Sequence, residues 1–311
     1  MNDHNEKPIA VLGAGVIGAS WTSLFLAAGY HVKVYDPSDG IQTAVADSIN
    51  DAWPTLEALN LTKNGDPRNY SFHDTPQSAV EGALFVKENV PERIEVKHDL
   101  YRKIESSLLP EAVVASSASG LMVKEMQKGW SDPSRFILGH PFNPPHLIPL
   151  VELVANDLTA PGVLELAESF YESVGKVTIR VNREVPAHVA NRLQAALWKE
   201  AIYLVQSGVA SVEDVDKAVW AGPGLRWAAM GPHMLFNLGA GEGGMQEFCA
   251  RYADSFHRWW DDLGDVEITL ETITQLVKGI EEEAKGESLK PLADQRDKLI
   301  VEFLIRKGDG E

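Results

Sequence analysis

The sequence predicts an α/β domain built on a doubly wound, mainly parallel sheet and followed by an all-helical domain. Up to about Arg183, short apolar runs alternate with longer segments of helical character, which is typical of parallel strands joined by helices. A glycine-rich turn directly follows the first apolar run, as it does in nucleotide-binding folds of this class. After Pro186 the strand-like runs stop, and apolar residues recur at helical spacing.

The expected elements follow one another in a regular order. The apolar runs predict strands at Ile9–Leu12, 31–35, 84–86, Val113–Ser116, 136–138, Leu150–Val154 and 176–181. The segments between them predict helices, notably at 41–59, 93–108 and 161–173. Further helices, broken by glycine, are expected at 188–206, 212–220, 245–263, 270–283 and 292–307. We therefore expect one domain over residues 6–185 and a helical domain over residues 186–311.

Composition and charge narrow the classes of partner. The formal net charge of −17 argues against binding to nucleic acid or to an anionic membrane, because both need a basic footprint. No apolar run approaches the roughly 18 residues that span a bilayer, and residues 1–7 lack the apolar stretch of a signal peptide. The single cysteine, Cys249, excludes an internal disulfide and fits a reducing cytoplasm. We expect it to be a small core residue, and we expect no metal site.

The glycine-rich turn predicts a binding site for a dinucleotide. It reads Gly13-Ala14-Gly15-Val16-Ile17-Gly18. Gly13 permits the tight turn, Gly15 lets the backbone approach a pyrophosphate, and Gly18 lets the helix pack close to the strand. The first turn of that helix, at Val16 and Ile17, offers unpaired N–H groups to the phosphates. A turn of this sequence without a ligand is the alternative interpretation.

Asp36 predicts which dinucleotide binds. It follows the second strand, at the position where a carboxylate accepts hydrogen bonds from the hydroxyls of a ribose. A carboxylate there repels a 2′-phosphate, and the next four residues include no arginine. We therefore expect NAD rather than NADP as the cofactor.

Three segments predict one catalytic site where strands end. Ser119 follows one strand, His140 lies in a proline-rich loop just after the next, and Glu152 interrupts the apolar run Leu150–Val154. Burying Glu152 costs several kcal/mol unless it is paired. A carboxylate that holds a histidine fixes one imidazole tautomer and raises its basicity. We therefore expect His140 and Glu152 to form a pair of a base and the group that orients it.

The motifs together resemble one enzyme family over nearly the full chain. They are GAGVIG at 13–18, VPERIEVK at 90–97, SSASGL at 116–121, GHPFNPP at 139–145, PLVELV at 149–154 and PAHVANRL at 186–193. This set is similar to that of the 3-hydroxyacyl-CoA dehydrogenases, in which a Rossmann-type domain precedes a helical one. The resemblance implies NAD-dependent oxidation of an L-3-hydroxyl group to a ketone.

The resemblance also implies catalytic roles for four residues. His140 matches the general base and Glu152 its partner, while Ser119 and Asn191 match residues that hold the substrate oxygen. Each has a plainer alternative. His140 can be an ordinary loop histidine and Glu152 part of a structural ion pair, while Ser119 can be a turn residue and Asn191 an amide on a helix face.

Further positions match the cofactor site, and two depart from the family pattern. Glu92 and Lys97 match cofactor contacts, and Asn143 matches a position against the nicotinamide. Ala118 stands where the family usually has threonine, so one substrate hydrogen bond is missing. His188 stands where an apolar residue is common, and either a new polar contact or simple solvation would explain it.

The substrate is expected to be a small 3-hydroxy acid rather than a CoA ester. Residues 36–61 include five acidic residues and no lysine or arginine, so this face would repel the phosphates of CoA. The segments 222–227 and 230–232 resemble the family branch that contains L-carnitine and L-gulonate 3-dehydrogenases, and the segments 52–54 and 197–201 favour the carnitine enzymes. We expect carnitine first, gulonate or another small acid second, and an acyl-CoA third.

Two features of the second domain suit such a substrate. Arg226 can bind both oxygens of a carboxylate, although a salt bridge is an equal alternative. Trp227, Trp259 and Trp260 can supply an aromatic surface for a trimethylammonium group, although tryptophan at helical spacing is more often part of a core.

The assembly and the class of protein leave alternatives open. Several apolar faces on few helices predict a homodimer through the helical domain. A crystallin-like protein that binds NAD without turnover is the non-enzymatic alternative, and the presence of Ser119, His140, Glu152 and Asn191 together argues against it. A 2-hydroxyacid or decarboxylating dehydrogenase of another family would give the motif at 140–145 no purpose.

Overall fold

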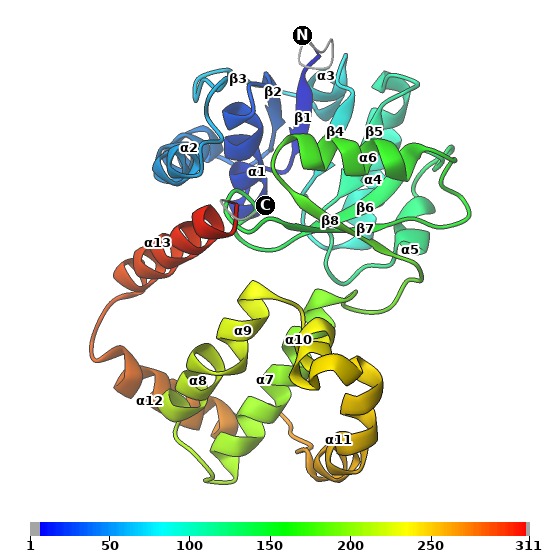
Figure 1. Cartoon of the computed structure of the whole chain (residues 1–311). Helices are drawn as coiled ribbons and strands as arrows, with labels where there is room; N and C mark the ends of the chain where they lie inside the picture. The colour runs from blue at the N-terminus through cyan, green and yellow to red at the C-terminus, as the bar shows by residue number, and fades with distance from the viewer. Residues whose placement is uncertain (1–6, 309–311) are drawn as a thin grey trace. The chain divides into compact units, whose positions relative to one another are not determined.

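The computed structural model describes residues 7–308, which fall into two compact units. We call the first the α/β unit, which includes the chain up to Ala190 together with Asp297–Gly308. We call the second, Asn191–Arg296, the helical unit. The predicted fold class, a Rossmann-type sheet followed by a helical domain, is confirmed (Figure 1).

The α/β unit is built on one eight-stranded sheet. The strands lie in the order β3-β2-β1-β4-β5-β6-β7-β8, and every neighbouring pair is parallel except β6 and β7. The order reverses between β1 and β4, the place where doubly wound sheets bind ligands. The strands are β1 (Ile9–Leu12), β2 (Val32–Tyr35), β3 (Tyr70–Phe72), β4 (Phe85–Glu88), β5 (Val113–Ser116), β6 (Phe136–Pro141), β7 (Leu150–Val154) and β8 (Val177–Val181).

Helices cover both faces of this sheet. One apolar cluster packs α1, α2 and α6 against one face, and a second packs α3, α4 and α5 against the other. The helices are α1 (Val16–Ala27), α2 (Ile41–Ala58), α3 (Pro76–Val80), α4 (Ile94–Ile104), α5 (Val123–Gln127) and α6 (Val163–Ser173), with the 3-10 turn η2 (Glu105–Ser107). The central strands β1, β4, β5 and β6 are buried along their whole length, as expected for strands covered by helices on both faces of the sheet.

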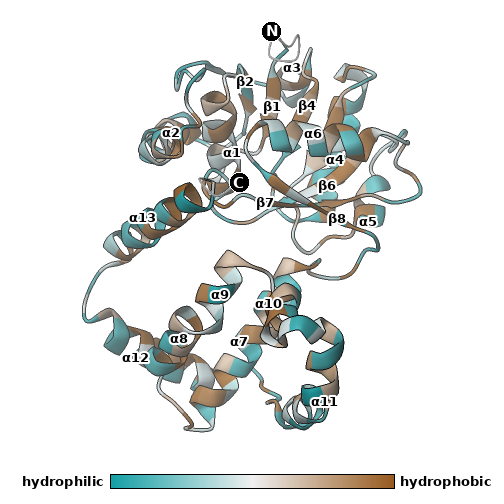
Figure 2. Cartoon of the chain, in the orientation of Figure 1, coloured by the Kyte–Doolittle hydropathy of each residue, from teal (hydrophilic) through white to brown (hydrophobic). Residues whose placement is uncertain are grey.

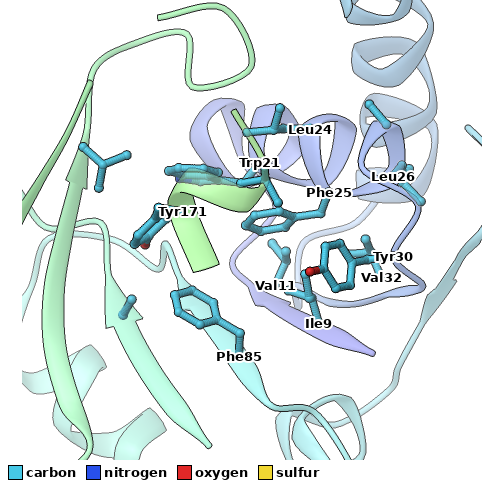
Figure 3. Close-up of a cluster of buried hydrophobic side chains, with 14 of the residues drawn as sticks. Ile9, Val11, Trp21, Leu24, Phe25, Leu26, Tyr30, Val32, Phe85 and Tyr171 are labelled. Atoms are coloured by element: carbon cyan, nitrogen blue, oxygen red, sulfur yellow. The ribbon is translucent and has the colours of Figure 1, made fainter. Parts of the chain in front are cut away.

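Aromatic rings fill the first cluster beneath the strands that carry the site. Figure 3 shows Trp21 and Phe25 on α1 close to Phe85 and Tyr171. The ring centres of Trp21 and Tyr171 are 5.5 Å apart, and those of Phe85 and Tyr171 are 5.3 Å apart in an edge-to-face arrangement. Such ring pairs stabilise a core beyond their buried area. This layer of rings packs directly against β4 at Phe85 and against β6 at Gly139.

The structure corrects one expectation about the strands. His140 does not lie in a loop after a strand, because β6 continues through His140 to Pro141. The connection at 142–149 is too short for a parallel crossover, which needs about a dozen residues or more, so β7 returns antiparallel to β6. The short elements β3, α3 and α5 were not predicted.

The helical unit consists of short and long helices with little buried surface. Its helices are α7 (Ala190–Gln206), α8 (Val212–Ala221), α9 (Pro223–Ala229), α10 (Pro232–Gly239), α11 (Gly244–Asp262), α12 (Leu270–Ala284) and the start of α13 (Leu289–Gly308), with the 3-10 turn η3 (Gly241–Gly243). Side-chain caps fix two starts, because Ser211 accepts from Asp214 N and Thr269 from Thr272 N. Figure 2 shows hydrophobic and hydrophilic residues on the same helices.

The helical unit differs from the sequence-based expectations at two helices and at its cysteine. Helices α9 and α10 were not predicted, because Pro223 and Pro232 look like helix breakers although each stands at the first helical position. Cys249 is exposed on α11, so its assignment to the core was wrong. None of the helices in residues 7–308 has the length and apolar character needed to cross a bilayer.

Candidate active site

The glycine-rich turn lies at the carboxyl end of β1. Gly13 has a φ of +82° and its N–H donates to the Tyr35 carbonyl at 2.8 Å. A Cβ at Gly13 would lie 2.7 Å from the backbone carbon of Asn89, and one at Gly18 would collide with the Gly13 carbonyl. Only glycine fits these two positions, so the turn has the geometry that its sequence predicts.

The turn leaves room and donors for a phosphate group. A Cβ at Gly15 would meet no atom within 4 Å, so the backbone is open there. Helix α1 begins at Val16, which is 75% exposed, and no side chain caps its first turn. The N–H groups of that turn are therefore available to an anion, with a favourable helix dipole.

Asp36 links the turn to the end of β2. Its Oδ2 accepts a hydrogen bond from Ala14 N at 2.7 Å, and its Oδ1 accepts one from Ser38 N at 2.9 Å. These two bonds hold the carboxylate at the edge of the sheet. Each oxygen keeps a further lone pair that can accept a ribose hydroxyl.

His140 and Glu152 face each other across the antiparallel pair. The two residues are register partners on β6 and β7, and His140 Nδ1 lies 2.8 Å from Glu152 Oε2. His140 is 5% exposed and Glu152 is completely buried. Since an ionised carboxylate can only accept, Nδ1 carries the proton and Nε2 is left as the free acceptor. This arrangement suits a general base.

Glu152 is ionised despite its burial. Its Oε1 accepts hydrogen bonds from Val189 N and Ala190 N, each at 2.9 Å. Burial alone would raise the pKa of Glu152, but the bonds from His140 and from these two N–H groups outweigh burial and hold the pKa below its usual value. The carboxylate is thus negative and can stabilise a positive imidazolium on His140.

Ser119 is held by Glu92. Its N–H donates to Glu92 Oε1 at 3.0 Å, and its hydroxyl donates to Glu92 Oε2 at 2.8 Å. Gly120 N and Leu121 N also donate to Glu92 Oε1. Burial raises the pKa of Glu92, but these bonds together hold it below the usual value. The Ser119 proton is therefore occupied, and its oxygen can only accept from another group.

A buried acid at the end of β4 was missed in the sequence. Glu88 is fully buried and accepts hydrogen bonds from Val90 N, Tyr101, Ser116 and Lys97, the last at 2.6 Å. This hydrogen-bond network joins the carboxyl ends of β4 and β5. Lys97 is 1% exposed, so its charge is neutralised by Glu88, and its expected contact with the cofactor stays a prediction.

Two buried lysines hold the chain around His140. Lys87 Nζ donates to the carbonyl of Gly139 at 2.5 Å, and Lys176 Nζ donates to the carbonyls of Pro145 and Ile148. Burial lowers the pKa of Lys87 well below its usual value, and it lowers the pKa of Lys176 to about 7. The signal in the sequence that could have found Lys87 is a charged residue directly after the apolar run at 84–86.

Other predicted site residues stay predictions. Asn143 is exposed in the connection between β6 and β7. In the helical unit, Asn191 is half-buried in α7, and Arg226 and Trp227 are exposed on α9. Arg226 makes no ion pair within residues 7–308. Trp259 and Trp260 are more than half exposed on α11.

Comparison with known proteins identifies the family. The NAD-binding domain model of 3-hydroxyacyl-CoA dehydrogenase matches residues 8–185, and the C-terminal domain model matches residues 188–269. The chain belongs to the 3-hydroxyacyl-CoA dehydrogenase family. The family predicted from the motifs is therefore confirmed, and so is its class as an NAD-dependent oxidoreductase.

Relatives of this dehydrogenase match nearly its full length. A protein of Streptomyces coelicolor named L-carnitine dehydrogenase is 42% identical over 98% of this chain and 96% of its own. One of the same name from Pseudomonas putida is 37% identical over 96% of this chain and 93% of its own. A solved 5-formyl-3-hydroxy-2-methylpyridine 4-carboxylic acid 5-dehydrogenase, an NAD⁺-dependent dismutase, has a TM-score of 0.80 at 29% identity, covering 95% and 96% of the two chains. FadB2 of M. tuberculosis has a TM-score of 0.63 at 27% identity, covering 82% and 88%.

NAD is the cofactor, and the residues of this dehydrogenase fit it. The open backbone at Gly15 and the uncapped start of α1 suit a pyrophosphate. Asp36 suits an unphosphorylated ribose, because its negative charge repels a 2′-phosphate.

Proposed function

We propose that this dehydrogenase oxidises the 3-hydroxyl of L-carnitine to the ketone, 3-dehydrocarnitine. The observation that carries the reaction type is the buried His140–Glu152 pair, in which Nε2 of His140 has no hydrogen bond within residues 7–308. The relatives named L-carnitine dehydrogenase, which match over nearly the full length, support the substrate. Helix α2 supports a small acid over a CoA ester, because Asp47, Asp51 and Glu57 are exposed on it without any lysine or arginine.

The chain's own residues carry the proton step. Bound NAD⁺ supplies the acceptor for the hydride on C3. His140 Nε2 takes the hydroxyl proton, and Glu152 stabilises the imidazolium that forms. The Ser119 oxygen can accept a hydrogen bond but cannot donate one, because its proton is bound to Glu92. In the reverse direction the same imidazolium returns the proton to the substrate oxygen.

The helical unit would hold the two ends of the substrate. We assign Arg226 to the carboxylate, because its guanidinium can bind both oxygens. Asn191 would contact the substrate oxygen, and Trp227 would face the trimethylammonium group. These assignments rest on residue chemistry and on the family motifs.

NADH formation with a panel of substrates tests the proposal. The panel contains L-carnitine, D-carnitine, L-gulonate and 3-hydroxybutyryl-CoA, each with NAD⁺. We expect turnover with L-carnitine and much less with the others. Arg226→Ala should raise KM for L-carnitine, while the exposed Arg258→Ala on α11 serves as a matched control. Preference for the CoA ester, or full activity in Arg226→Ala, would contradict the corresponding part of the proposal.

We also propose a homodimer formed through the helical unit. Few large apolar side chains of this unit are buried, whereas many are exposed within the described chain: Leu193, Trp198, Trp220, Leu225, Met234, Leu238, Trp259 and Trp260. A second copy would bury such a surface by a symmetric contact. Light scattering on the full chain should give twice the mass of one chain, and a monomer at micromolar concentration would exclude the dimer. The exposed thiol of Cys249 fits a reducing cytoplasm.

A further inference from the structure

A second histidine, His188, lies beside the His140–Glu152 pair, which we call the dyad. His188 is 3% exposed, and within residues 7–308 neither Nδ1 nor Nε2 has a hydrogen-bond partner. Its ring centre is 5.3 Å from that of His140, with the ring planes at 50°. Buried polar groups in native proteins are nearly always hydrogen-bonded. An unbound, buried imidazole next to a catalytic base therefore points to a ligand. The same burial excludes the alternative that His188 is simply solvated.

The backbone at His188 is strained and fixed by the dyad. Ala187 and His188 have φ values of +61° and +48°, a region that residues other than glycine rarely adopt. The next two N–H groups, of Val189 and Ala190, bind Glu152 Oε1. Strain of this kind persists where surrounding contacts impose it, and it collects at functional sites. The carboxylate that orients His140 thus also fixes the segment that carries His188.

His188 is a neutral donor. Burial lowers the pKa of His188, and the adjacent His140 lowers it further, against the opposing effects of Glu152 and Glu92. A neutral imidazole has one N–H donor and one acceptor nitrogen. It stays neutral when His140 takes up a proton, because a second positive charge beside the first would be repelled.

The two residues so far assigned to the substrate oxygen in the α/β unit, Ser119 and His140, do not donate a side-chain hydrogen bond to it during oxidation. The oxygen on C3 becomes negative as its proton leaves, so it needs hydrogen-bond donors. Ser119 cannot serve, because its proton is bound to Glu92. His140 receives the substrate proton and so does not donate during oxidation. His188 lies next to His140 and has a ring N–H that is unbound within residues 7–308.

We propose that His188 is a catalytic residue that donates a hydrogen bond to the C3 oxygen of the substrate, the same oxygen whose proton His140 removes. Two ring centres 5.3 Å apart suit this role, because one oxygen can lie within hydrogen-bond distance of a nitrogen of each ring. The bond strengthens as the oxygen becomes negative and so lowers the barrier. The inference rests on the proposed oxidation of a 3-hydroxy acid, but it does not depend on which acid.

Two substitutions separate the donor from the shape of the ring. His188→Phe keeps a flat ring and removes both nitrogens, whereas His188→Asn keeps an N–H donor. Loss of one such donor should lower kcat by roughly 10²–10³-fold in His188→Phe. His188→Asn should recover at least about tenfold of that loss. The affinity for NAD⁺ should stay unchanged in both variants, and His31→Phe, a partly buried histidine at the β2 edge, is the matched control.

The outcomes distinguish this proposal from the proposed substrate. A kcat for His188→Phe within about threefold of the unaltered enzyme, or equal losses in both variants, would overturn the role of His188. His188→Leu and His188→Gln form a second pair should His188→Phe fail to fold. The ratios are measured with L-carnitine and with L-3-hydroxybutyrate, and in reverse with acetoacetate. Failure of L-carnitine alone would count against the substrate proposal and leave the ratios measurable.

Discussion

At the scale of single residues, each acid of the site has its charge fixed by N–H and O–H donors. Glu152 accepts from His140 and from two backbone N–H groups, and Glu92 accepts from Ser119 and the two residues after it. Charge-assisted bonds of this kind are roughly twice as strong as neutral ones. The loop at 119–121 and the imidazole of His140 are therefore positioned before any substrate arrives.

The first prediction concerns His140. His140→Gln should lower kcat by about 10²–10⁴-fold, the usual contribution of a general base. Its affinity for NAD⁺ should be nearly unchanged, because the glycine-rich turn and Asp36 lie on other strands. Steady-state kinetics and NAD⁺ titration check this, with His98→Gln on α4 as control. Undiminished turnover in His140→Gln would remove the base assignment.

The second prediction concerns Asp36. Asp36→Ser removes the negative charge that repels a 2′-phosphate, so the preference for NAD⁺ over NADP⁺ should narrow. The ratio of kcat/KM for the two cofactors measures this. The exposed Asp39→Ser, three residues away, is the matched control. An unchanged ratio in Asp36→Ser would mean that cofactor choice is set elsewhere.

At the scale of elements, the antiparallel β6–β7 pair builds the dyad. Register places His140 directly opposite Glu152, and side chains of register partners lie on the same face of a sheet. A parallel pair with a helical crossover would bring Glu152 from a distant segment. The short connection at 142–149 thus couples the base and its orienting acid within one hairpin-like unit.

The third prediction concerns the network that joins β4, β5 and α4. Glu88→Gln keeps the shape but leaves the buried Lys97 without its counter-charge. Breaking a buried ion pair in this way costs about 3–5 kcal/mol in the free energy of unfolding. Urea denaturation measures the loss. Glu125→Gln, which breaks an exposed pair with Lys128, should change little, and an equally small effect at Glu88 would contradict the prediction.

Strong apolar runs were enough to predict most strands. Strands β1, β5 and β7 have the predicted bounds, because each is a mainly apolar run bounded by residues of a different character, and β7 is interrupted only by Glu152. Strand β3 has three half-buried residues and no such run. The pairing of His140 with Glu152 could be inferred because a lone carboxylate in an apolar strand requires a partner. The strained turn at Ala187 and His188 contains no glycine, so nothing in the sequence predicts it.

At the scale of the whole molecule, buried lysines make stability depend on pH. The Nζ atoms of Lys87 and Lys176 lie 4.9 and 5.1 Å from the centre of the Trp21 indole ring. Carbonyl groups and the aromatic ring are their neighbours, and desolvation by burial disfavours their charged forms. Folding therefore releases protons at pH values where the unfolded chain would keep them.

The fourth prediction gives the sign of this dependence. Burial lowers the pKa of Lys176 from its usual value of 10.5 to about 7 in the folded protein. Between these values the unfolded chain binds one more proton, so the free energy of unfolding should rise with pH across this window. Lys176→Met should reduce the slope, with Lys87 still contributing in the same direction. Urea midpoints measured from neutral to alkaline pH check this. Lys63 is exposed, so Lys63→Met is the control and should leave the slope of stability against pH unchanged. An unchanged slope in Lys176→Met would contradict the prediction.

The contact between Gly139 and Tyr171 restricts how this protein can be redesigned. The Tyr171 hydroxyl packs so closely on Gly139 that any side chain at position 139 would collide with it. Lys87 of β4 also binds the carbonyl of Gly139. These two contacts fix the position of β6, so the strand that carries His140 cannot move to make room for a larger substrate. Libraries aimed at new substrates should leave β6 untouched and vary exposed positions such as those of α9.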